Sequence, residues 1–470
     1  MNIFKNCKSL IIILLMLLGG NQSLNSQNNV ELNDAWNEID KILERIVPPV
    51  FPENEYSVLK YGACPDGVTD TRDAINSAID ICSAEGGGKV ILPQGNYLVN
   101  GPLILKSNVN LHLEEGAYVR FGTNPKDYLI GEEKYNGCVK VRWEGTWCYN
   151  YSPLIYCWGA NNVAITGKGT IDGQVDKYWF EWKFLQKPDQ SNLQQMGENL
   201  IPIDKRLFGE GHYLRPGTIE FYYCKNVLVE GITSRMPIER NIHPTFCDNV
   251  IIRNVNIQPG VKKIRNDDGI DPDSCIDVLI ENCTIHAYDD AIVVKSGRDN
   301  DAWSENGGRS SENIIIRNNK MLGGHNGFSI GSDMAGGVRN VFVYNCEMGL
   351  VEPMQYGINI KANSDRGGIV ENIFVKDIKI DSCESAIYIE TDYKNIQYDS
   401  IEHPYPPLYK NMFFNNINCK VATQIGIYIQ GIEVKPIENI NLCDISILKA
   451  KLPYTLNNIN SLSIINLQIN

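Results

Sequence analysis

One six-residue pattern of hydrophobic and polar positions recurs through the second half of the chain. Each copy begins with Asn or Asp, continues with three apolar residues and ends with two further, mostly polar residues. The clearest copies are NVLVEG at 226, NVIIRN at 249, DVLIEN at 277, NIIIRN at 313, NVFVYN at 340 and NIFVKD at 372, and looser copies are NMFFNN at 411 and NINLCD at 439. The first and third apolar residues of each copy share one face of a strand, so we expect that face to point inward.

The spacing of the copies predicts the fold class. The start-to-start steps from 226 to 372 are 23, 28, 36, 27 and 32 residues, a length typical of solenoid repeats. Because no convincing crossover helix follows any copy, the pattern favours an all-β parallel β-helix in which each repeat is one coil. Corresponding residues of neighbouring coils would then stack about 4.8 Å apart. The recurring Asn should form a ladder at a coil corner, and the unequal steps predict loops that wall a groove.

The N-terminal part of the chain predicts three segments. Residues 1–22 have the order of a secretory signal peptide, with Lys5 and Lys8 before an apolar run over 10–18 that is too short to span a bilayer. Residues 23–52 form an extension with a possible amphipathic helix over 34–46 and the Pro-rich joint VPPVFP. Residues 53–470 form the β-helix as a single domain. We therefore expect a secreted or periplasmic protein without a membrane span.

The β-helix is expected to begin with a short helix. Asp70 or Thr71 can cap it, and Gly86–Gly88 end it before a strand. Its apolar positions recur at helical spacing: Ala74, Ile75, Ala78, Ile79 and Cys82.

Charge and cysteine content narrow the partners. A formal net charge of −13 makes nucleic acid a poor partner and argues mildly against an anionic substrate unless basic residues gather locally. Five basic residues surround the acidic cluster described next: Lys262, Lys263, Arg265, Lys295 and Arg298. An ordinary solvated face is an equally good interpretation of this group. One or two disulfides are possible, with Cys138 pairing with Cys148 or Cys157, while Cys224, Cys247 and Cys275 should stack inside.

The candidate chemistry centres on HAYDDAIVVKSG at 286–297, which contains the adjacent acids Asp289 and Asp290. Asp268 lies 22 residues before Asp290, about one coil, in RNDDGIDPDSC together with Asp267 and Asp271. Later coils bring His325 in GGHNG, and then Lys361 and Arg366. A lone pair of aspartates is more often a structural turn, but this alignment favours a site on one wall of the solenoid.

Such a cluster suits glycoside hydrolysis. Two carboxyl groups must flank the glycosidic bond, one protonated as the acid and one ionised as base or nucleophile. Neighbouring negative charges raise the pKa of one member, so the aspartates would titrate as a coupled group. Glycines around His325 favour a functional role for it, whereas His243 and His286 lack such support and are interpreted as structural.

From Tyr56 onward the sequence resembles glycoside hydrolase family 28, the polygalacturonases and related pectinases. The resemblance rests on five motifs: NDDG at 266–269, DD at 289–290, GHNG at 324–327, IK at 360–361 and YIETDY at 388–393. It implies a right-handed β-helix and an inverting hydrolase that cleaves α-galacturonosyl linkages in pectin, with no metal or organic cofactor. The expected substrate is a pectic polysaccharide or oligogalacturonide, and we expect a monomer.

The resemblance also assigns roles. Asp289 would be the general acid, Asp268 and Asp290 would hold and activate water, and His325 would tune the acid. For inversion, the acid and base should lie roughly 6.5–9.5 Å apart. Substrate binding falls to four residues: Lys361, Tyr393, Asn266 and Asn359.

Two departures from the family pattern concern specificity. Asn359 stands where the family usually has Arg, and Ile238, Glu239 and Arg240 stand where an aromatic residue commonly follows Pro. The first favours a neutral sugar such as rhamnose, or a decorated chain, in the leaving-group subsite. Endo and exo action stay open, as do two other classes. These are a non-catalytic β-helical carbohydrate-binding adhesin, which the DGVTDTRDAINSAID segment also resembles, and a calcium-dependent pectate lyase.

Overall fold

The computed structural model describes residues 36–304, 308–392 and 405–470. The chain forms two compact units, Met1–Arg45 and Ile46–Asn470. The first contains a helix over 36–45, within the expected amphipathic segment. The signal-peptide prediction and Tyr393 lie outside the described residues. Where the chain is described, no helix is both long and apolar enough to cross a membrane.

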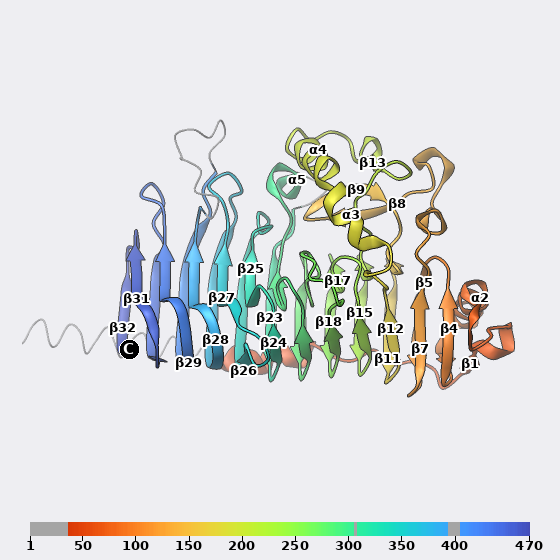
Figure 1. Ribbon diagram of the computed structural model, residues 1–470, viewed down its shortest axis with the longest axis horizontal. Coiled ribbons are helices and arrows are strands. Elements are labelled where there is room, and N and C mark those ends of the chain that lie inside the picture. The colour runs from red at the N-terminus through yellow and green to blue at the C-terminus, as the bar shows by residue number, and fades with distance from the viewer. Residues whose placement is uncertain (1–35, 305–307, 393–404) are drawn as a thin grey trace, which may run out of the picture. The chain divides into compact units, whose positions relative to one another are not determined.

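The second unit is the predicted parallel β-helix, whose coils are stacked side by side in Figure 1. The strands that carry the repeated motif form one face, here called the motif face. Val227 pairs in parallel with Val250, Val250 with Val278, and the register continues through every later copy of the motif. In chain order these strands are β15 (Lys225–Glu230), β18 (Asp248–Arg253), β20 (Ile276–Glu281), β23 (Ser311–Arg317), β26 (Val338–Met348), β28 (Ile369–Glu390), β29 (Leu408–Gln430) and β30 (Glu438–Ile447).

Earlier coils extend the motif face toward the N-terminus and add a second face beside it. The motif face includes β1 (Glu55–Ser57), β3 (Gly88–Leu92), β6 (Val109–Leu113) and β11 (Asn161–Gly167), and it ends with β32 (Leu462–Ile469). The second face comprises β2 (Asp66–Asp70), β4 (Gly95–Val99), β7 (Ala117–Phe121), β12 (Thr170–Asp172), β16 (Thr233–Arg235), β19 (Asn256–Gln258), β21 (Thr284–His286) and β24 (Lys320–Gly323), and then the later parts of the long strands.

A third face positions the functional site. Its strands are β5 (Leu103–Leu105), β10 (Ile155–Trp158), β14 (Ile219–Tyr222), β17 (Ile242–Thr245), β22 (Ile292–Val294), β25 (Asn326–Gly331), β27 (Met354–Lys361), the C-terminal ends of β28 and β29, and β31 (Ala450–Asn457). Isolated parallel bridges from Ile242 to Ile270 and from Ile270 to Ile292 connect β17 with β22.

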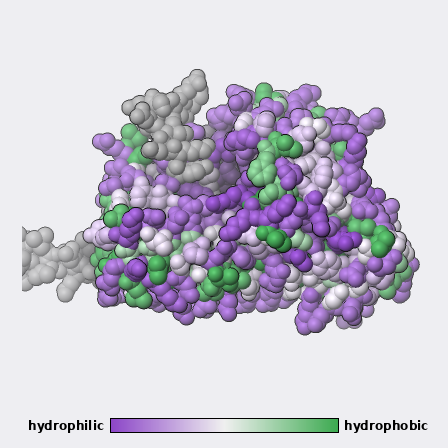
Figure 2. Space-filling view, in the orientation of Figure 1, coloured by the Kyte–Doolittle hydropathy of each residue, from purple (hydrophilic) through white to green (hydrophobic). Residues whose placement is uncertain are grey.

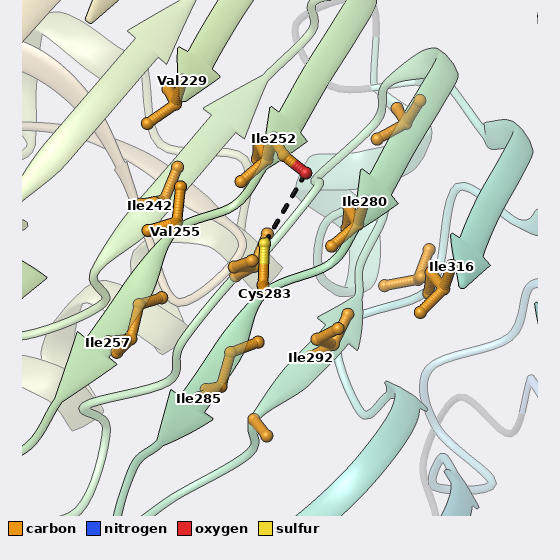
Figure 3. Packing of buried hydrophobic residues seen from close by; sticks show 14 of the residues in the cluster. Val229, Ile242, Ile252, Val255, Ile257, Ile280, Cys283, Ile285, Ile292 and Ile316 are labelled. Carbon is orange, nitrogen blue, oxygen red and sulfur yellow. Dashed lines mark hydrogen bonds between the residues drawn. The ribbon is translucent and has the colours of Figure 1, made fainter. Parts of the chain in front are cut away.

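The core of the solenoid is a stack of aliphatic side chains. Val229, Ile252, Ile280 and Ile316 follow one another from coil to coil, and the Cys283 thiol donates to the Ile252 carbonyl at 3.7 Å (Figure 3). The first and third apolar residues of the motif are inside, as predicted. The middle apolar residues are also buried and stack on the outer side. Their aromatic members include Phe342 and Phe374, whose ring centroids lie 5.0 Å apart.

The Asn ladder is confirmed. Each motif Asn or Asp adopts a positive φ, between 54° and 59°, at which Asn and Asp are favoured over most other residues. The side-chain amide of each ladder Asn typically donates to the ladder residue of the preceding coil: Asn226 to Asn162, Asn249 to Asn226, Asn313 to Asp277, Asn340 to Asn313, Asn372 to Asn340, Asn411 to Asn372 and Asn439 to Asn411.

We expect Asn340→Ala to lower the free energy of unfolding by about 2–3 kcal/mol, because it removes two ladder hydrogen bonds and places a Cβ-bearing residue without a local partner at positive φ. Asn340→Gly should cost about 1–2 kcal/mol, since glycine tolerates this backbone conformation. Denaturant unfolding of both variants measures the difference. Equal losses would show that the backbone conformation does not explain the choice of Asn.

The N-terminal helix is α2 (Arg72–Ala84), and it precedes β3 as expected. Asp70 provides the cap, since its Oδ1 accepts the Arg72 N–H at 3.1 Å, whereas Thr71 makes no side-chain capping bond. Four of the five predicted apolar positions are buried, and Ala74 packs against the core at its edge. The Pro-rich joint lies on the ladder, where Val47 exchanges hydrogen bonds of 3.1 and 2.8 Å with the Asn249 side chain.

Two long excursions leave the third face and were not predicted. Residues 122–154 contain the hairpin β8 (Val139–Trp143) and β9 (Thr146–Asn150), and residues 173–218 contain α3 (Trp179–Leu185), α4 (Lys187–Glu198) and β13 (Leu207–Phe208). They share a small hydrophobic core that includes Trp147 and Leu193, and they stand above the solenoid together with α5 (Asp299–Trp303) in Figure 1. We call these two segments the inserted wall.

Of the two cysteine predictions, one is confirmed and one is wrong. Cys224, Cys247 and Cys275 are buried inside the solenoid, as expected. The suggested disulfides are wrong, because Cys138, Cys148 and Cys157 are free and buried. Cys157 instead faces the next coil, with its Sγ 3.6 Å from the Cys224 Sγ.

Candidate active site

The predicted acids meet on adjacent coils of the third face. The Gly269 N–H donates to the Asp290 carbonyl at 2.9 Å, and Ile270 bridges Ile292, which confirms the step of 22 residues between Asp268 and Asp290. Both acids line a cleft of about 440 Å³. The other lining residues are Glu144, Lys187, Gln190, Gln194, Arg240, Arg265, Asn266, Asp289, Lys295, Arg298, His325, Gly331, Ser332, Asp333, Lys361 and Arg366. The fold therefore brings together the cluster that the coil spacing predicts.

Asp268 is held as an anion. Its Oδ2 accepts the Lys295 ammonium at 2.9 Å, and the same ammonium lies 3.3 Å from Asp271 Oδ2. Burial alone would raise the Asp268 pKa, but the charges of Lys295 and Arg240 outweigh it and hold that pKa below its usual range. Asp268 is thus the member of the cluster suited to accept a proton.

The pKa of Asp289 is shifted in the opposite direction. Its Oδ2 accepts the Asn266 backbone N–H at 2.9 Å. Burial, followed by the charges of Asp268 and Asp290, raises the Asp289 pKa against a smaller opposing effect of His325 and Lys361. Asp289 therefore keeps its proton to a higher pH than Asp268 does. Two carboxyl groups with pKa values shifted apart supply an acid and a base in one cleft.

Asp290 lies between two donors on the next coils. The Asn326 side-chain amide donates to its Oδ1, and the Lys361 ammonium donates to its Oδ2 at 3.2 Å. Burial would lower the Lys361 pKa, but Asp290 and Asp289 outweigh it and raise that pKa, so Lys361 stays charged. The backbone around these acids is fixed by Asp267, which accepts the N–H groups of Tyr288 and Asp289 at 3.0 and 2.8 Å.

His325 approaches the acids through its backbone. Its N–H donates to the Asp289 carbonyl at 3.0 Å, and a Cβ on the preceding Gly324, at φ +144°, would lie 2.6 Å from the same oxygen. Glycine is therefore required before His325. Burial lowers the His325 pKa in spite of Asp290 and Asp289, and Nδ1 is buried without a hydrogen-bond partner among the described residues. A mostly neutral imidazole with an unused ring nitrogen thus borders the cleft.

The remaining predicted substrate-binding residues do not all lie in the cleft. Asn266 lines the cleft, but its Oδ1 already accepts the Lys183 ammonium and Arg215 at 3.4 Å. Asn359 does not belong to the cleft lining; it is only 1% exposed, and the strand register places it between Ser329 and Tyr388. Tyr393 lies outside the described residues.

The two histidines interpreted as structural are not part of the cleft lining, although His243 lies 3.4 Å from the lining residue Arg240. His243 is fully buried, with Nδ1 3.2 Å from Glu220 Oε1 and Nε2 3.7 Å from Asp273 Oδ2. These bonds outweigh its burial and raise the His243 pKa to about 9. His286 pairs with Glu352 at 2.8 Å.

The inserted wall contributes cleft residues that the sequence analysis missed. Lys187, Gln190 and Gln194 come from α4, and Glu144 comes from the β8–β9 turn. The Gln190 side-chain amide donates to Glu144 Oε2 at 2.6 Å and connects the two segments. The inserted wall also reaches the catalytic coil, since Lys183 of α3 donates to Asn266. It thereby encloses the cleft on the side of the earlier coils.

The charge of the cleft differs from that of the whole chain. Seven basic side chains and five acidic ones line it, although the chain carries a formal net charge of −13. Of the five basic residues predicted around the acids, Arg265, Lys295 and Arg298 line the cleft. Lys262 lies over the Phe180 ring, and Lys263 pairs with Glu352 at 3.1 Å. The face seen in Figure 2 is largely hydrophilic.

Arg240, one of the departures from the family pattern, belongs to this charged lining. Its guanidinium lies 3.1 Å from Asp271 Oδ2 and 3.6 Å from Asp333 Oδ2. Asp333 in turn lies 3.4 Å from Arg366 and 3.7 Å from Arg298. Where the resemblance led us to expect an aromatic residue, Arg240 thus belongs to a buried ion-pair network.

Comparison with known proteins agrees with this arrangement. Residues 209–464 match the family described as Glycosyl hydrolases family 28, and residues 56–136 match that described as Rhamnogalacturonase A/epimerase, pectate lyase-like. The first match spans more than half of the chain and includes the acids, His325 and Lys361. The chain belongs to glycoside hydrolase family 28. It is a polygalacturonase-like hydrolase of pectin.

Individual relatives extend over most of the chain. A hyperthermoactive exopolygalacturonase from Thermotoga maritima is 37% identical, with 93% of this chain and 96% of that chain covered and a TM-score of 0.84. A probable polygalacturonase of Vitis vinifera is 26% identical over 87% of this chain and 78% of its own length. An endo-polygalacturonase of Pectobacterium carotovorum is 25% identical over 77% of this chain and 81% of its own length.

Proposed function

We propose that this family 28 hydrolase removes galacturonosyl residues one at a time from the end of a pectic chain, with inversion at the anomeric carbon. The observation that carries the proposal is the cleft itself, in which an excess of cations surrounds two carboxyl groups of opposite pKa tendency and the inserted wall encloses one side. Cations attract a galacturonate carboxylate. A wall on one side limits how far a chain extends past the cleft in that direction.

In the proposed mechanism Asp289 donates its proton to the leaving oxygen. Asp268, kept ionised by Lys295, accepts a proton from the attacking water, and Asp290 orients that water from between Asn326 and Lys361. His325 borders Asp289 and positions the sugar on the leaving-group side. The Lys361 ammonium is near enough to Asp290 to serve the water and the sugar carboxylate together.

Exo action has support from the similarity to the Thermotoga exopolygalacturonase, while relatives named endo-polygalacturonases lie at lower identity. The inserted wall offers a physical reason, because its residues Glu144, Lys187 and Gln190 line the cleft together with the acids. We also propose that the protein is secreted or periplasmic, as residues 1–22 indicate.

Product analysis on polygalacturonate and on oligogalacturonides tests the proposal. Exo action predicts monomer as the sole early product and a slow fall in viscosity per new reducing end. The first-formed anomer, followed by NMR, should be inverted. Early mixed oligomers would instead establish endo action, and unsaturated products would establish a lyase.

Two other classes are less well supported. Calcium lyase chemistry needs carboxylates free to chelate, but Asp268 and Asp290 each already pair with an ammonium. A purely binding β-helix would have no need of carboxyl groups with separated pKa values. Absence of any hydrolysis product from every pectic substrate would favour the binding protein.

A further inference from the structure

Three tyrosines form a continuous stack on the third face, on the side away from the inserted wall. Tyr356, Tyr388 and Tyr428 come from the successive strands β27, β28 and β29. The ring centroids of Tyr356 and Tyr388 lie 4.1 Å apart with planes at 13°, and those of Tyr388 and Tyr428 lie 4.5 Å apart at 14°. All three side chains are partly exposed. We call them the tyrosine strip.

The tyrosine strip begins beside the catalytic residues. The His325 and Tyr356 rings lie 6.2 Å apart, and the Tyr356 N–H donates to the His325 carbonyl at 3.0 Å. A second cavity of about 280 Å³ shares Arg265 and His325 with the active cleft and reaches Gln355 and Glu384. Gln355 donates to the Tyr356 hydroxyl at 3.1 Å. A polymer leaving the cleft past His325 therefore comes close to Tyr356, the first member of the tyrosine strip.

The charges near the tyrosine strip are negative. Glu390 lies on the same strand end as Tyr388, with its Oε2 3.5 Å from the Tyr388 hydroxyl, and its charge acts on all three phenols. Glu384 adds a second negative charge near Tyr356. Lys361, in register with Glu390, is already paired with Asp290. The position where the family usually has Arg holds the neutral, buried Asn359, next to Tyr388 in the register.

We propose that the tyrosine strip binds the sugar residues on the leaving-group side of the scissile bond, and that these residues are uncharged. This rests on the proposed hydrolysis of a terminal galacturonosyl residue. Because the rings stack on one another, they present their edges to the groove, an uncharged surface against which pyranose rings pack. A galacturonate carboxylate placed there would be repelled by Glu384, and by Glu390 at pH values above the Glu390 pKa, which burial raises to about 7. The enzyme thus recognises an acidic sugar in the cleft and a neutral chain beyond it.

Two substrates share this chemistry. One is a galacturonosyl residue attached to a neutral sugar, and the other is a terminal galacturonate attached to methyl-esterified galacturonic acid. The test compares kcat/KM for three trisaccharides with the same terminal galacturonate: trigalacturonate, its form esterified at the other two residues, and a form with rhamnose at the adjacent position. A p-nitrophenyl galacturonide, too short to cover the tyrosine strip, serves as the common reference.

We expect kcat/KM to be at least about tenfold higher for one or both uncharged trisaccharides than for trigalacturonate. Tyr388→Ala should remove most of that advantage while altering hydrolysis of the aryl galacturonide by less than about threefold, and Tyr388→Phe should retain it. Glu390→Gln should improve trigalacturonate selectively. Tyr344→Ala, on the motif face, is the matched control and should leave the ratios unchanged.

The outcomes separate the two proposals. The better uncharged trisaccharide identifies the source of the neutral residue. If trigalacturonate is preferred and Tyr388→Ala and Glu390→Gln affect all trisaccharides equally, the inference is overturned although the hydrolase proposal stands. If the aryl galacturonide and all trisaccharides are left intact, the proposed function itself fails. Tyr428→Ala provides a second variant should Tyr388→Ala not fold.

Discussion

Asp289→Asn is expected to lower kcat on a natural pectic substrate by about 10²–10⁴-fold, because the amide cannot give a proton to the leaving oxygen. An aryl galacturonide should lose much less, since nitrophenolate departs without full protonation. The wild-type enzyme should lose activity as the pH rises through the raised pKa of Asp289, because the acid is then deprotonated. That alkaline decline should be absent for the variant. Steady-state kinetics on both substrates across pH provide the measurement.

Asp277→Asn is the matched control for this experiment. It makes the same chemical change on the Asn ladder, where Asp277 at φ 58° accepts the Asn313 amide at 3.0 Å, outside the cleft lining. We expect kcat close to that of the wild type. If Asp289→Asn keeps kcat within about twofold on the natural substrate, Asp289 is not the general acid and the role must pass to another carboxyl group.

The parts of the fold that repeat were predictable from sequence. A coil of a solenoid contacts only its neighbours, so the register of the motif face follows from local spacing. The same logic placed Asp268 beside Asp290, because a step of 22 residues is one coil. It also brought His325 and Lys361 to the same wall. The periodicity of the sequence therefore predicted which residues form most of the candidate catalytic cluster.

The segments of the chain that do not repeat were not predicted from the sequence. Lys187, Gln190 and Glu144 come from the inserted wall, which has its own hydrophobic core and no counterpart in other coils. The aromatic run YWFEWKFL at 178–185 was the available signal of a separately packed segment. The depth of Asn359 could not be predicted from the spacing of the motifs, and the structure buries this residue outside the cleft lining.

The directions of the pKa shifts of the carboxyl groups could not be predicted from the sequence either. Adjacent aspartates suggested only that one member would keep a proton. The direction of each shift depends on where Lys295 and Arg240 lie, and these come from different coils. The excess of basic side chains in the cleft of an acidic protein likewise needed the three-dimensional arrangement.

Lys295→Met is expected to lower the free energy of unfolding by about 3–5 kcal/mol, because it leaves Asp268 and Asp271 buried together without their shared cation. Burial raises the Asp271 pKa well above its usual range, so Asp271 takes up a proton as the pH falls and the loss of stability should be smaller at lower pH. Lys320→Met, an exposed lysine of β24, should change stability by less than about 0.5 kcal/mol. Denaturant unfolding of the two variants compares a buried with an exposed cation.

The same variant tests the role of Asp268. Lys295 helps to hold the Asp268 pKa below its usual range, so removing the ammonium should raise that pKa. A catalytic base must be ionised, and activity is lost as the pH falls through its pKa; the acid limb of kcat/KM should therefore move to higher pH in Lys295→Met. An acid limb that stays in place while stability falls would show that the buried ion pairs support the fold alone, and that the base is Asp290 rather than Asp268.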